Sequence, residues 1–327
     1  MKITVKKITI VAAILAVIGG VLFLAAWGMG ADGYISWGRG GLRVGGTGTP
    51  ETLSRRDIEG VRSVRVDAVG ADVEFFPARD FGFEIFTYDG EPEWSLSGGV
   101  LTVREFASGF RLFNFAFTAL RGGGYTAYIK LYYPEDAPLD ELSVSSVSGD
   151  VVFPGADGAV RSAAFETTSG GISVESLATG TLTLKTVSGN IRTRGVTSDK
   201  ARLETSSGDS ELELFSGGLE GKTVSGNIDV SAVSLYGRLD STSGDVTVSA
   251  EEADLEIATV SGGVVFTSPA REEDISYDVE TVSGNITVNG RGLGKYAQSP
   301  RGGRFGIDVN TVSGDVKITF AISPNPS

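Results

Sequence analysis

Nearly the same eight residues occur nine times between Ser146 and Ile318, and the clearest copy, TVSGNITV, occupies residues 281–288. When the copies are aligned on the glycine of their Ser-Gly pair, the spacing is 18 to 22 residues, with one interval of 30. The aligned glycines are Gly149, Gly170, Gly189, Gly208, Gly226, Gly244, Gly262, Gly284 and Gly314. A near-constant period of this size predicts a solenoid, whose coils bury apolar side chains only against neighbouring coils.

The repeat also predicts where each coil bends. In a single straight strand, the odd-numbered Val279 and Thr281 would face one side, and the even-numbered Ile286 and Val288 would face the other. Since all four are expected in the core, the chain must turn a corner in the Val-Ser-Gly-Asn stretch between them. We expect glycine there because it accepts a positive φ, and Asp or Asn after it because both tolerate the left-handed region. The positions two and four after the glycine, and five before it, are mostly aliphatic and predict core columns.

The predicted fold is therefore all-β, a single-stack β-solenoid of about nine coils of 18–22 residues that occupies residues 139–320. Residues 58–138 are β-rich but aperiodic, and we expect them to cap the first coil, since an open solenoid end must be covered. Their AVGADVEF stretch is a degenerate copy of the repeat that is expected to start the stack. Residues 321–327 form a proline-containing tail that stops strand pairing.

The N-terminus indicates a membrane anchor. Residues 8–27 hold no charged side chain over 20 positions, which is long enough for a transmembrane helix. A cleaved signal peptide is the alternative, although its apolar region is usually only about 7–15 residues long. Because Lys2, Lys6 and Lys7 precede the span, residues 1–7 should stay cytoplasmic and the ectodomain should be extracellular. The glycine-rich residues 28–57 are expected to be a tether.

Charge and composition exclude several function classes. The chain has a net charge of −13, and residues 1–7 contribute three lysines and no acid, so the rest carries −16. Such a surface repels nucleic acid. There is no His and no Cys, which excludes disulfides, imidazole or thiolate metal sites, and nucleophilic mechanisms that need either residue. We expect no cofactor.

The acidic corner positions are the remaining candidates for catalysis or metal binding. Asp150, Asp209, Asp245 and Asp315 follow the repeat glycine, but Asn or Gly takes this place in other repeats. This variation is typical of a turn position rather than of a paired acid and base. One carboxylate per coil also falls short of the 6–8 oxygens that Ca²⁺ prefers. We therefore expect no enzyme and no metal site. A polysaccharide-acting β-helix enzyme and a scaffold that self-associates end to end stay open as alternatives.

The 30-residue interval contains a basic insertion, NGRGLGKYAQSPRGGRFG, at residues 289–306. Its candidate ligand-binding residues are Arg291, Lys295, Tyr296, Arg301, Arg304 and Phe305. Insertions in repeat proteins often lie on the binding face, and guanidinium groups hold phosphate or carboxylate groups well. The insertion could thus bind an anionic envelope polymer or a surface protein. Alternatively, it is a glycine-rich excursion whose basic side chains lie on the acidic coils.

Several motifs resemble a known family. They are V-x-V-x-x-x-G-A-D-V-E-F at residues 64–75, SGGVLTVRE at 97–105, LYYP at 131–134 and the serial T-V-S-G-D/N corners. With the lysine-flanked span, residues 58–320 resemble the bacterial putative-adhesin domain family of unknown function, in its membrane-anchored, LiaG-like form. The resemblance implies surface display, binding at a Gram-positive envelope and, in some cases, a link to envelope stress. It supplies no catalytic residues.

Overall fold

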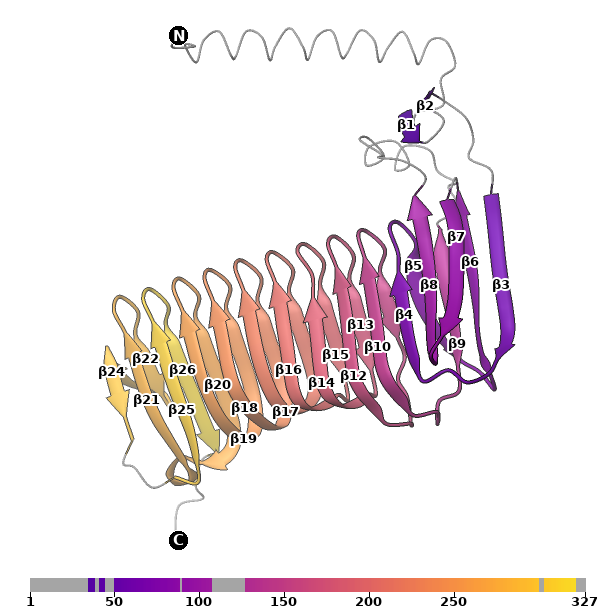
Figure 1. Ribbon diagram of the computed structural model, residues 1–327. Coiled ribbons are helices and arrows are strands. Elements are labelled where there is room, and N and C mark those ends of the chain that lie inside the picture. The colour runs from indigo at the N-terminus through magenta and orange to yellow at the C-terminus, as the bar shows by residue number, and fades with distance from the viewer. Residues whose placement is uncertain are drawn as a thin grey trace, which may run out of the picture.

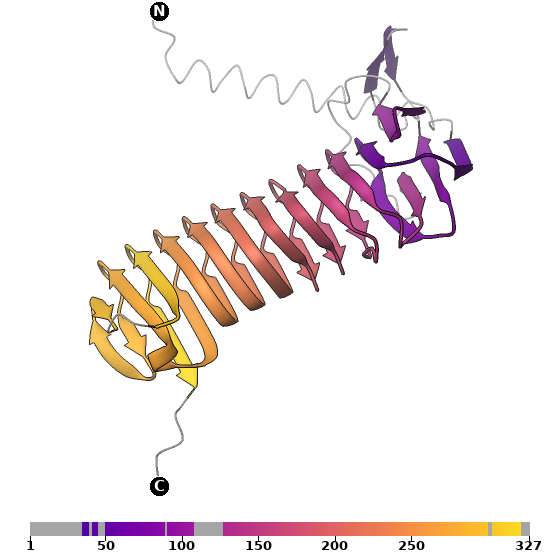
Figure 2. The same ribbon diagram turned by 60° about the horizontal axis from the view of Figure 1, so that its bottom comes forward.

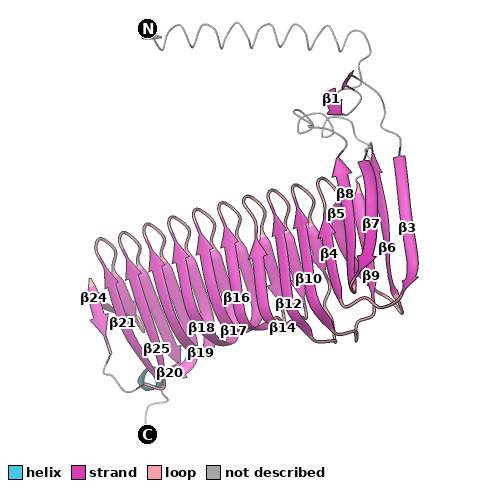
Figure 3. Cartoon of the chain, in the orientation of Figure 1, coloured by secondary structure: helices cyan, strands magenta, loops and turns pink. Residues whose placement is uncertain are grey.

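The structure is a computed structural model that describes residues 35–38, 41–44, 50–88, 90–107, 127–299 and 303–321. The predicted membrane span at residues 8–27 lies outside them. Among the helices of the described residues, none has the length and apolar character needed to cross a membrane. Figure 3 shows that strands dominate the described chain, with one short 3₁₀ helix, η2 (Glu272–Asp274), near the C-terminal end. The described chain is therefore all-β.

The first strands precede the repeats. They are β1 (Ile35–Gly38), β2 (Gly41–Val44), β3 (Pro50–Ile58), β4 (Ser63–Asp67), β5 (Asp72–Pro77), β6 (Phe81–Tyr88), β7 (Gly90–Ser97), β8 (Val100–Ala107) and β9 (Tyr128–Tyr133). β1 and β2 pair only with each other, whereas the others join the main sheet system.

The repeats supply the remaining strands. They are β10 (Leu139–Ser146), β11 (Val151–Phe153), β12 (Val160–Thr167), β13 (Ile172–Glu175), β14 (Ala178–Lys185), β15 (Ile191–Arg194), β16 (Thr197–Thr205), β17 (Ser210–Thr223), β18 (Ile228–Ser241), β19 (Val246–Thr259), β20 (Val264–Arg271), β21 (Ile275–Thr281), β22 (Ile286–Val288), β23 (Arg291–Gly294), β24 (Tyr296–Gln298), β25 (Phe305–Thr311) and β26 (Val316–Ala321).

Successive coils stack in parallel and form two broad faces (Figure 1). The strand before each Ser-Gly corner belongs to what we call the long-strand face, for example β10, β12, β14 and β16. The strand after the corner belongs to the short-strand face, for example β11, β13 and β15. β17, β18 and β19 each continue around the other edge and take part in both faces. Figure 2 shows the same strand direction recurring from coil to coil. The predicted solenoid and its corners are thus observed.

The threonine of the motif holds the corner together. The hydroxyl of Thr186 accepts a hydrogen bond from the backbone N–H of Gly189 at 3.0 Å and donates one to the Gly170 carbonyl of the preceding coil at 3.2 Å. The same bond to the glycine N–H recurs at 2.9–3.1 Å in seven other repeats. Thr186 is buried. Its hydroxyl therefore satisfies backbone groups that the sharp corner removes from the sheet.

The glycine of the motif has a different role from the one the sequence suggested. None of the nine repeat glycines adopts a positive φ, and none of the Asp or Asn residues after them does. A Cβ on Gly244 would lie 1.7 Å from the Gly226 carbonyl oxygen of the adjacent coil, and the other repeat glycines are equally close to their neighbours. The expectation of left-handed corners was wrong. Glycine is required because the coils stack too closely for any side chain.

The core columns are confirmed. Side chains two and four positions after the glycine, such as Ile228 and Val230, are at most 4% exposed in every repeat. The position five before the glycine, such as Leu239, is equally buried. By contrast, the valine between Thr and Ser is exposed, to 52% at Val224, because the chain changes direction there. The apolar interior is continuous from the first coil to the last.

The C-terminal coils do not stack in sequence order. β25 pairs with β19 on one side and with β21 on the other, and β26 lies in the same way between β20 and β22. The last coil of the sequence is thus inserted between the coils of Gly262 and Gly284, as the yellow strands in Figure 1 show. The 30-residue interval between Gly284 and Gly314 supplies the extra chain that must run back past the coil of Gly284 to reach this inner position.

The N-terminal end has a similar arrangement. β4 and β5 form a coil that pairs with β10 and β11 on one side and with β8 and β9 on the other. The AVGADVEF stretch is therefore a true coil, but it does not start the stack, because the later strands β8 and β9 lie outside it. Antiparallel strands cover both ends. At the N-terminal end, β7 pairs with β8 and β6 pairs with β9. At the C-terminal end, β24 pairs with β21 and β23 pairs with β22.

Candidate functional site

The basic insertion forms part of the C-terminal cap. Arg291 starts β23 and makes an ion pair with Glu272. Lys295 donates a hydrogen bond from its ammonium group to the Gly284 carbonyl. Arg304 lies 3.7 Å from the Glu252 carboxylate. Arg301 lies outside the described residues. Each described basic side chain of the insertion therefore contacts an acid or a carbonyl of its own chain, which agrees with the structural alternative that the sequence left open.

The two aromatic residues of the insertion lie apart. Tyr296, in β24, pairs with Glu280 near the end of β21, whereas Phe305, in β25, pairs with Ile275 at its start. These positions on β21 are five residues apart, or roughly 17 Å. Tyr296 is 54% exposed, while Phe305 is half-buried and packs against the core beneath the Arg304 guanidinium. The described candidate residues are thus spread over β23, β24 and the start of β25, and they do not converge on one site.

The corner carboxylates form a structural ladder. The Oδ1 atom of Asp209 accepts a hydrogen bond from the backbone N–H of Asn227 at 2.9 Å, and Asn227 Oδ1 accepts one from the N–H of Asp245 at 3.0 Å. Asp245 in turn accepts one from Gly263 at 2.7 Å. Asp and Asn supply the same acceptor atom, which explains why they interchange. Gly171 and Gly263 donate to the ladder but cannot continue it.

An acidic row lies on the long-strand face near the C-terminal end. Glu256, Asp308 and Asp278 occupy adjacent strands in register. Partial burial, followed by the charges of Asp278 and Glu256, raises the pKa of Asp308 above its usual 3.8. Among the described residues, however, no three acidic side chains converge closely enough to hold a metal ion. The row is partly compensated by Arg238, which pairs with Glu256.

A shallow open groove of about 510 Å³ runs across the edge opposite the corners, where β10, β12, β14 and β16 begin. Its charged lining residues are Asp140, Arg161 and Asp199. Arg161 and Asp140 lie 3.5 Å apart and are both largely exposed, so their attraction is weak and screened by solvent. The groove offers a shallow polar surface rather than an enclosed pocket.

The sequence interpretation missed a group of outward-facing aromatic residues at the N-terminal end. In β9, Tyr128, Lys130 and Tyr132 point outward and alternate with the buried Ile129, Leu131 and Tyr133. On the neighbouring strands Phe76 pairs with Tyr132, and Phe86 pairs with Tyr128. The signal was present in the alternation of residues 128–133, but the sequence interpretation used them only as part of the β-rich segment 58–138 and, at residues 131–134, as a family motif.

Parallel coils, a continuous apolar interior and antiparallel strands at both ends define a β-solenoid repeat protein. The profile of the Toastrack DUF4097 family matches residues 91–319, more than half of the chain, and the chain belongs to that family. The resemblance to the putative-adhesin domain family of unknown function is thereby confirmed. No curated protein gives a significant match.

Solved structures with a similar chain course are distant in sequence. A protein from Parabacteroides distasonis ATCC 8503, described as a putative lipid binding protein, is 16% identical with a TM-score of 0.49, over 84% of this chain and 98% of its own. A putative adhesin from Parabacteroides merdae ATCC 43184 is 14% identical with a TM-score of 0.47, over 84% and 97%. A putative adhesin from Parabacteroides distasonis ATCC 8503 gives 13% and 0.46, over 84% and 97%.

Proposed function

We propose that this chain is a non-enzymatic, membrane-anchored protein of the bacterial cell surface, with an adhesin-like binding or structural role at the envelope. Residues 8–27 would cross the lipid bilayer once, with residues 1–7 in the cytoplasm and the solenoid outside the cell. The observation that carries the proposal is the closed stack itself. A rod with a continuous core and paired ends is suited to presenting a surface at a distance from its anchor.

β3 begins inside the expected tether of residues 28–57 but pairs with β6, so its residues belong to the sheet, and its register supports a tether that joins one end of the rod. Pro50, the first residue of β3, pairs with Tyr88 at the end of β6. Two residues earlier in β6, Phe86 pairs with Tyr128 of β9, and Tyr128 pairs with Asp72, which follows a corner. The chain therefore enters the described body at its N-terminal end, on the edge that carries the corners. This geometry leaves the long axis of the stack free to extend away from the entry point.

The corner ladder supports a non-enzymatic role. A carboxylate that accepts a backbone N–H from the next coil, as Asp245 does, is already engaged in a structural bond. An acid and base for glycoside hydrolysis must instead face a shared substrate position. No corner holds more than one of the repeat acids, and each of these acids accepts a backbone N–H from an adjacent coil: Asp150, Asp209, Asp245 and Asp315.

Topology can be tested by adding protease to intact protoplasts that carry the full chain. The part beyond Gly48 should be digested, whereas a variant that lacks residues 8–27 should be protected inside the cell. Complete protection of the full chain would contradict the proposal. Incubation of the purified chain with envelope polysaccharide would expose an enzyme through the release of reducing ends. A link to envelope stress predicts higher expression after envelope damage.

A self-assembling scaffold is the second candidate. β3 pairs with β6 at one edge and lies at the outer end of the stack in Figure 1. Its nine residues are mostly exposed, and an end strand of this kind can pair with another copy. Light scattering of the purified chain would reveal growth with concentration. A constant particle size would rule this candidate out.

A further inference from the structure

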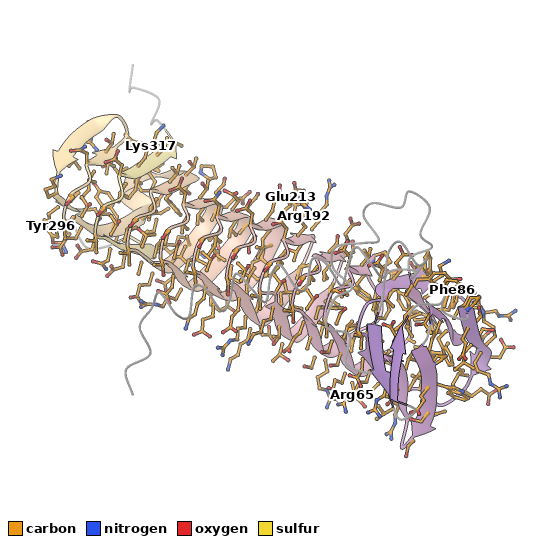
Figure 4. All side chains as sticks on the ribbon, turned by 90° about the horizontal axis from the view of Figure 1, so that it is seen from above. Arg65, Phe86, Arg192, Glu213, Tyr296 and Lys317 are labelled. Atoms are coloured by element: carbon orange, nitrogen blue, oxygen red, sulfur yellow. The ribbon has the colours of Figure 1, made fainter. Side chains whose placement is uncertain are left out.

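The outer surface at the N-terminal end differs chemically from the rest of the short-strand face. We call Phe76, Phe86, Tyr128 and Tyr132 the aromatic platform. Figure 4 shows Phe86 on the same broad side of the molecule as Arg192, Glu213 and Lys317, with Arg65 on the opposite side. The outward positions of the repeat coils on this face are mostly polar or charged. Aromatic side chains replace them only in the strands before the first full repeat of the described chain.

The platform consists of two cross-strand ring pairs. The rings of Phe76 and Tyr132 stack with centroids 5.8 Å apart and an interplanar angle of 30°. Those of Phe86 and Tyr128 stack at 5.4 Å and 20°. Tyr128 and Tyr132 are four residues apart on β9, so the two pairs are separated by roughly 13 Å along the strand. Phe76 is 36% exposed, and the other three side chains are half-buried.

Charged groups lie between and beside the ring pairs. Lys130 occupies the outward position between the two tyrosines, and its ammonium nitrogen is 4.4 Å from the Tyr128 ring centroid. The Arg56 guanidinium carbon lies 3.3 Å from the centroid of Tyr132. Glu74 and Glu84 are in register with Lys130 on either side. Tyr128 donates a hydrogen bond to Glu84 at 2.6 Å. The rings and polar groups are thus held by contacts already present.

We propose that the aromatic platform is a binding site for a neutral polysaccharide, an inference that deepens the proposed surface role and rests on it. A pyranose ring has an apolar C–H face that packs on an aromatic ring, and a rim of hydroxyl groups that hydrogen-bond to carboxylates and ammonium groups. In a chain of sugars, apolar faces and hydroxyl groups alternate along the polymer. The two ring pairs, with hydrogen-bond donors and acceptors between them, have the same alternation. The site is an open sheet surface, which suits an extended polymer better than a small molecule.

The local charges select a neutral ligand. Two cations, Lys130 and Arg56, lie among the three carboxylates of Asp72, Glu74 and Glu84, so the platform has no excess of positive charge, and the chain as a whole is strongly acidic. An anionic polymer would therefore gain little at the platform and would be repelled by the coils. A protein partner also uses Tyr and Arg contacts. Among the described residues, the carboxylate and ammonium groups beside the rings give the sugar hydroxyls polar partners, which favours the sugar, and the experiment separates the two.

The test uses the purified full chain in detergent micelles. The probe is the protein-free neutral polysaccharide fraction of the producing bacterium's envelope, immobilised on beads. A double variant, Phe76→Ser with Tyr132→Ser, should lower retention by about tenfold or more, because each ring contact contributes about one kcal/mol. Tyr128→Phe keeps its ring and should retain binding. Tyr236→Ser changes an exposed tyrosine on the long-strand face and is the matched control.

Melting temperatures of all variants are measured alongside, and that of the double variant should fall only slightly, because a cross-strand ring pair contributes about 0.2–1 kcal/mol. Lost retention by a variant that is still fully folded at the assay temperature supports the site. Equal retention of parent and double variant overturns it, as does failure of the parent to bind the beads. Retention on untreated envelope that is lost after protease treatment of the envelope would assign a protein partner instead. None of these outcomes depends on the protoplast experiment, so the site and the surface location can fail separately.

Discussion

Gly314 stands directly over Gly262, whose carbonyl oxygen lies 1.9 Å from the place that a Cβ on Gly314 would take. Gly284 lies between them in the sequence but stands beyond Gly314 in the stack. The last coil is therefore held between two earlier coils on both faces. Its strands cannot separate from the end without also breaking the pairing of β21 and β22. This threading, together with the antiparallel cap, protects the C-terminal end from fraying.

The close glycine stacking gives the first prediction. Gly244→Ala places a methyl group 1.7 Å from a backbone carbonyl, so two coils must separate, at a cost of at least about 3 kcal/mol. Gly292→Ala is the matched control, because its Cβ would meet no atom of the described residues within 4 Å and its φ is not positive. Urea denaturation of both variants checks the difference. Similar stability of the two would contradict the account of the repeat glycine.

The core assignment gives the second prediction. Ile228→Asp puts an uncompensated carboxylate at a position with no solvent exposure, and should cost roughly 3–5 kcal/mol. Asp245→Asn keeps the Oδ1 atom that accepts the Gly263 N–H and should change stability by less than about 0.5 kcal/mol. Thermal unfolding of both variants measures this. Comparable effects would mean that the inside and outside of the coil have been misassigned.

The sequence was sufficient to predict where the corners and the core columns lie, because parity and period depend only on local residues, but it did not predict the backbone conformation of the corners. It could not predict the coil order. The core residues of the last coil, such as Val316 and Ile318, would pack equally well at the end of the stack, beyond the coil of Gly284. Their sequence therefore does not tell this arrangement from the observed one, in which the last coil lies between the coils of Gly262 and Gly284. The basic insertion was recognised as unusual, but its partners, such as Glu272, are set by that threading. The aromatic platform depends on pairing between distant strands, which a single sequence does not reveal.

A defect in the core gives the third prediction. Ser210 occupies a column that is otherwise Val or Ile, is fully buried, and its hydroxyl has no hydrogen-bond partner among the residues that the structure describes. In register it lies between Ile191 and Ile228, so its neighbours in the column are both apolar. Ser210→Val should raise stability by about 1 kcal/mol, because it removes an unpaired buried polar group and adds apolar contact. A lower melting temperature would show that the site cannot accept the extra methyl groups.

The coil of β4 and β5 gives the fourth prediction. It lacks the threonine of the repeat and uses Glu105 of the adjacent coil instead, whose Oε2 atom accepts the backbone N–H groups of Val69, Gly70 and Ala71, each at 2.9 Å. Glu105→Ala would leave these donors unpaired and should cost roughly 2–4 kcal/mol. Faster hydrogen exchange at residues 69–71 is the specific readout. Glu93→Ala, at an exposed position on β7, should leave both stability and exchange unchanged.

The acidic row gives the last prediction, which concerns pH. Because the pKa of Asp308 is raised in the folded chain, its charged form destabilises the fold at neutral pH. That penalty disappears as pH falls through the raised pKa and is absent below the ordinary value of 3.8. Asp308→Asn should therefore raise the melting temperature at pH 7, with a difference that shrinks on acidification and vanishes below pH 3.8. The amide oxygen can still accept the hydrogen bond that Asn310 donates at 2.6 Å.

Asp278→Asn should act in the same direction, since it removes the neighbouring charge. Melting curves from pH 7 to pH 3 for both variants and the parent provide the check. A difference that grows on acidification would reverse the sign and contradict the assigned repulsion.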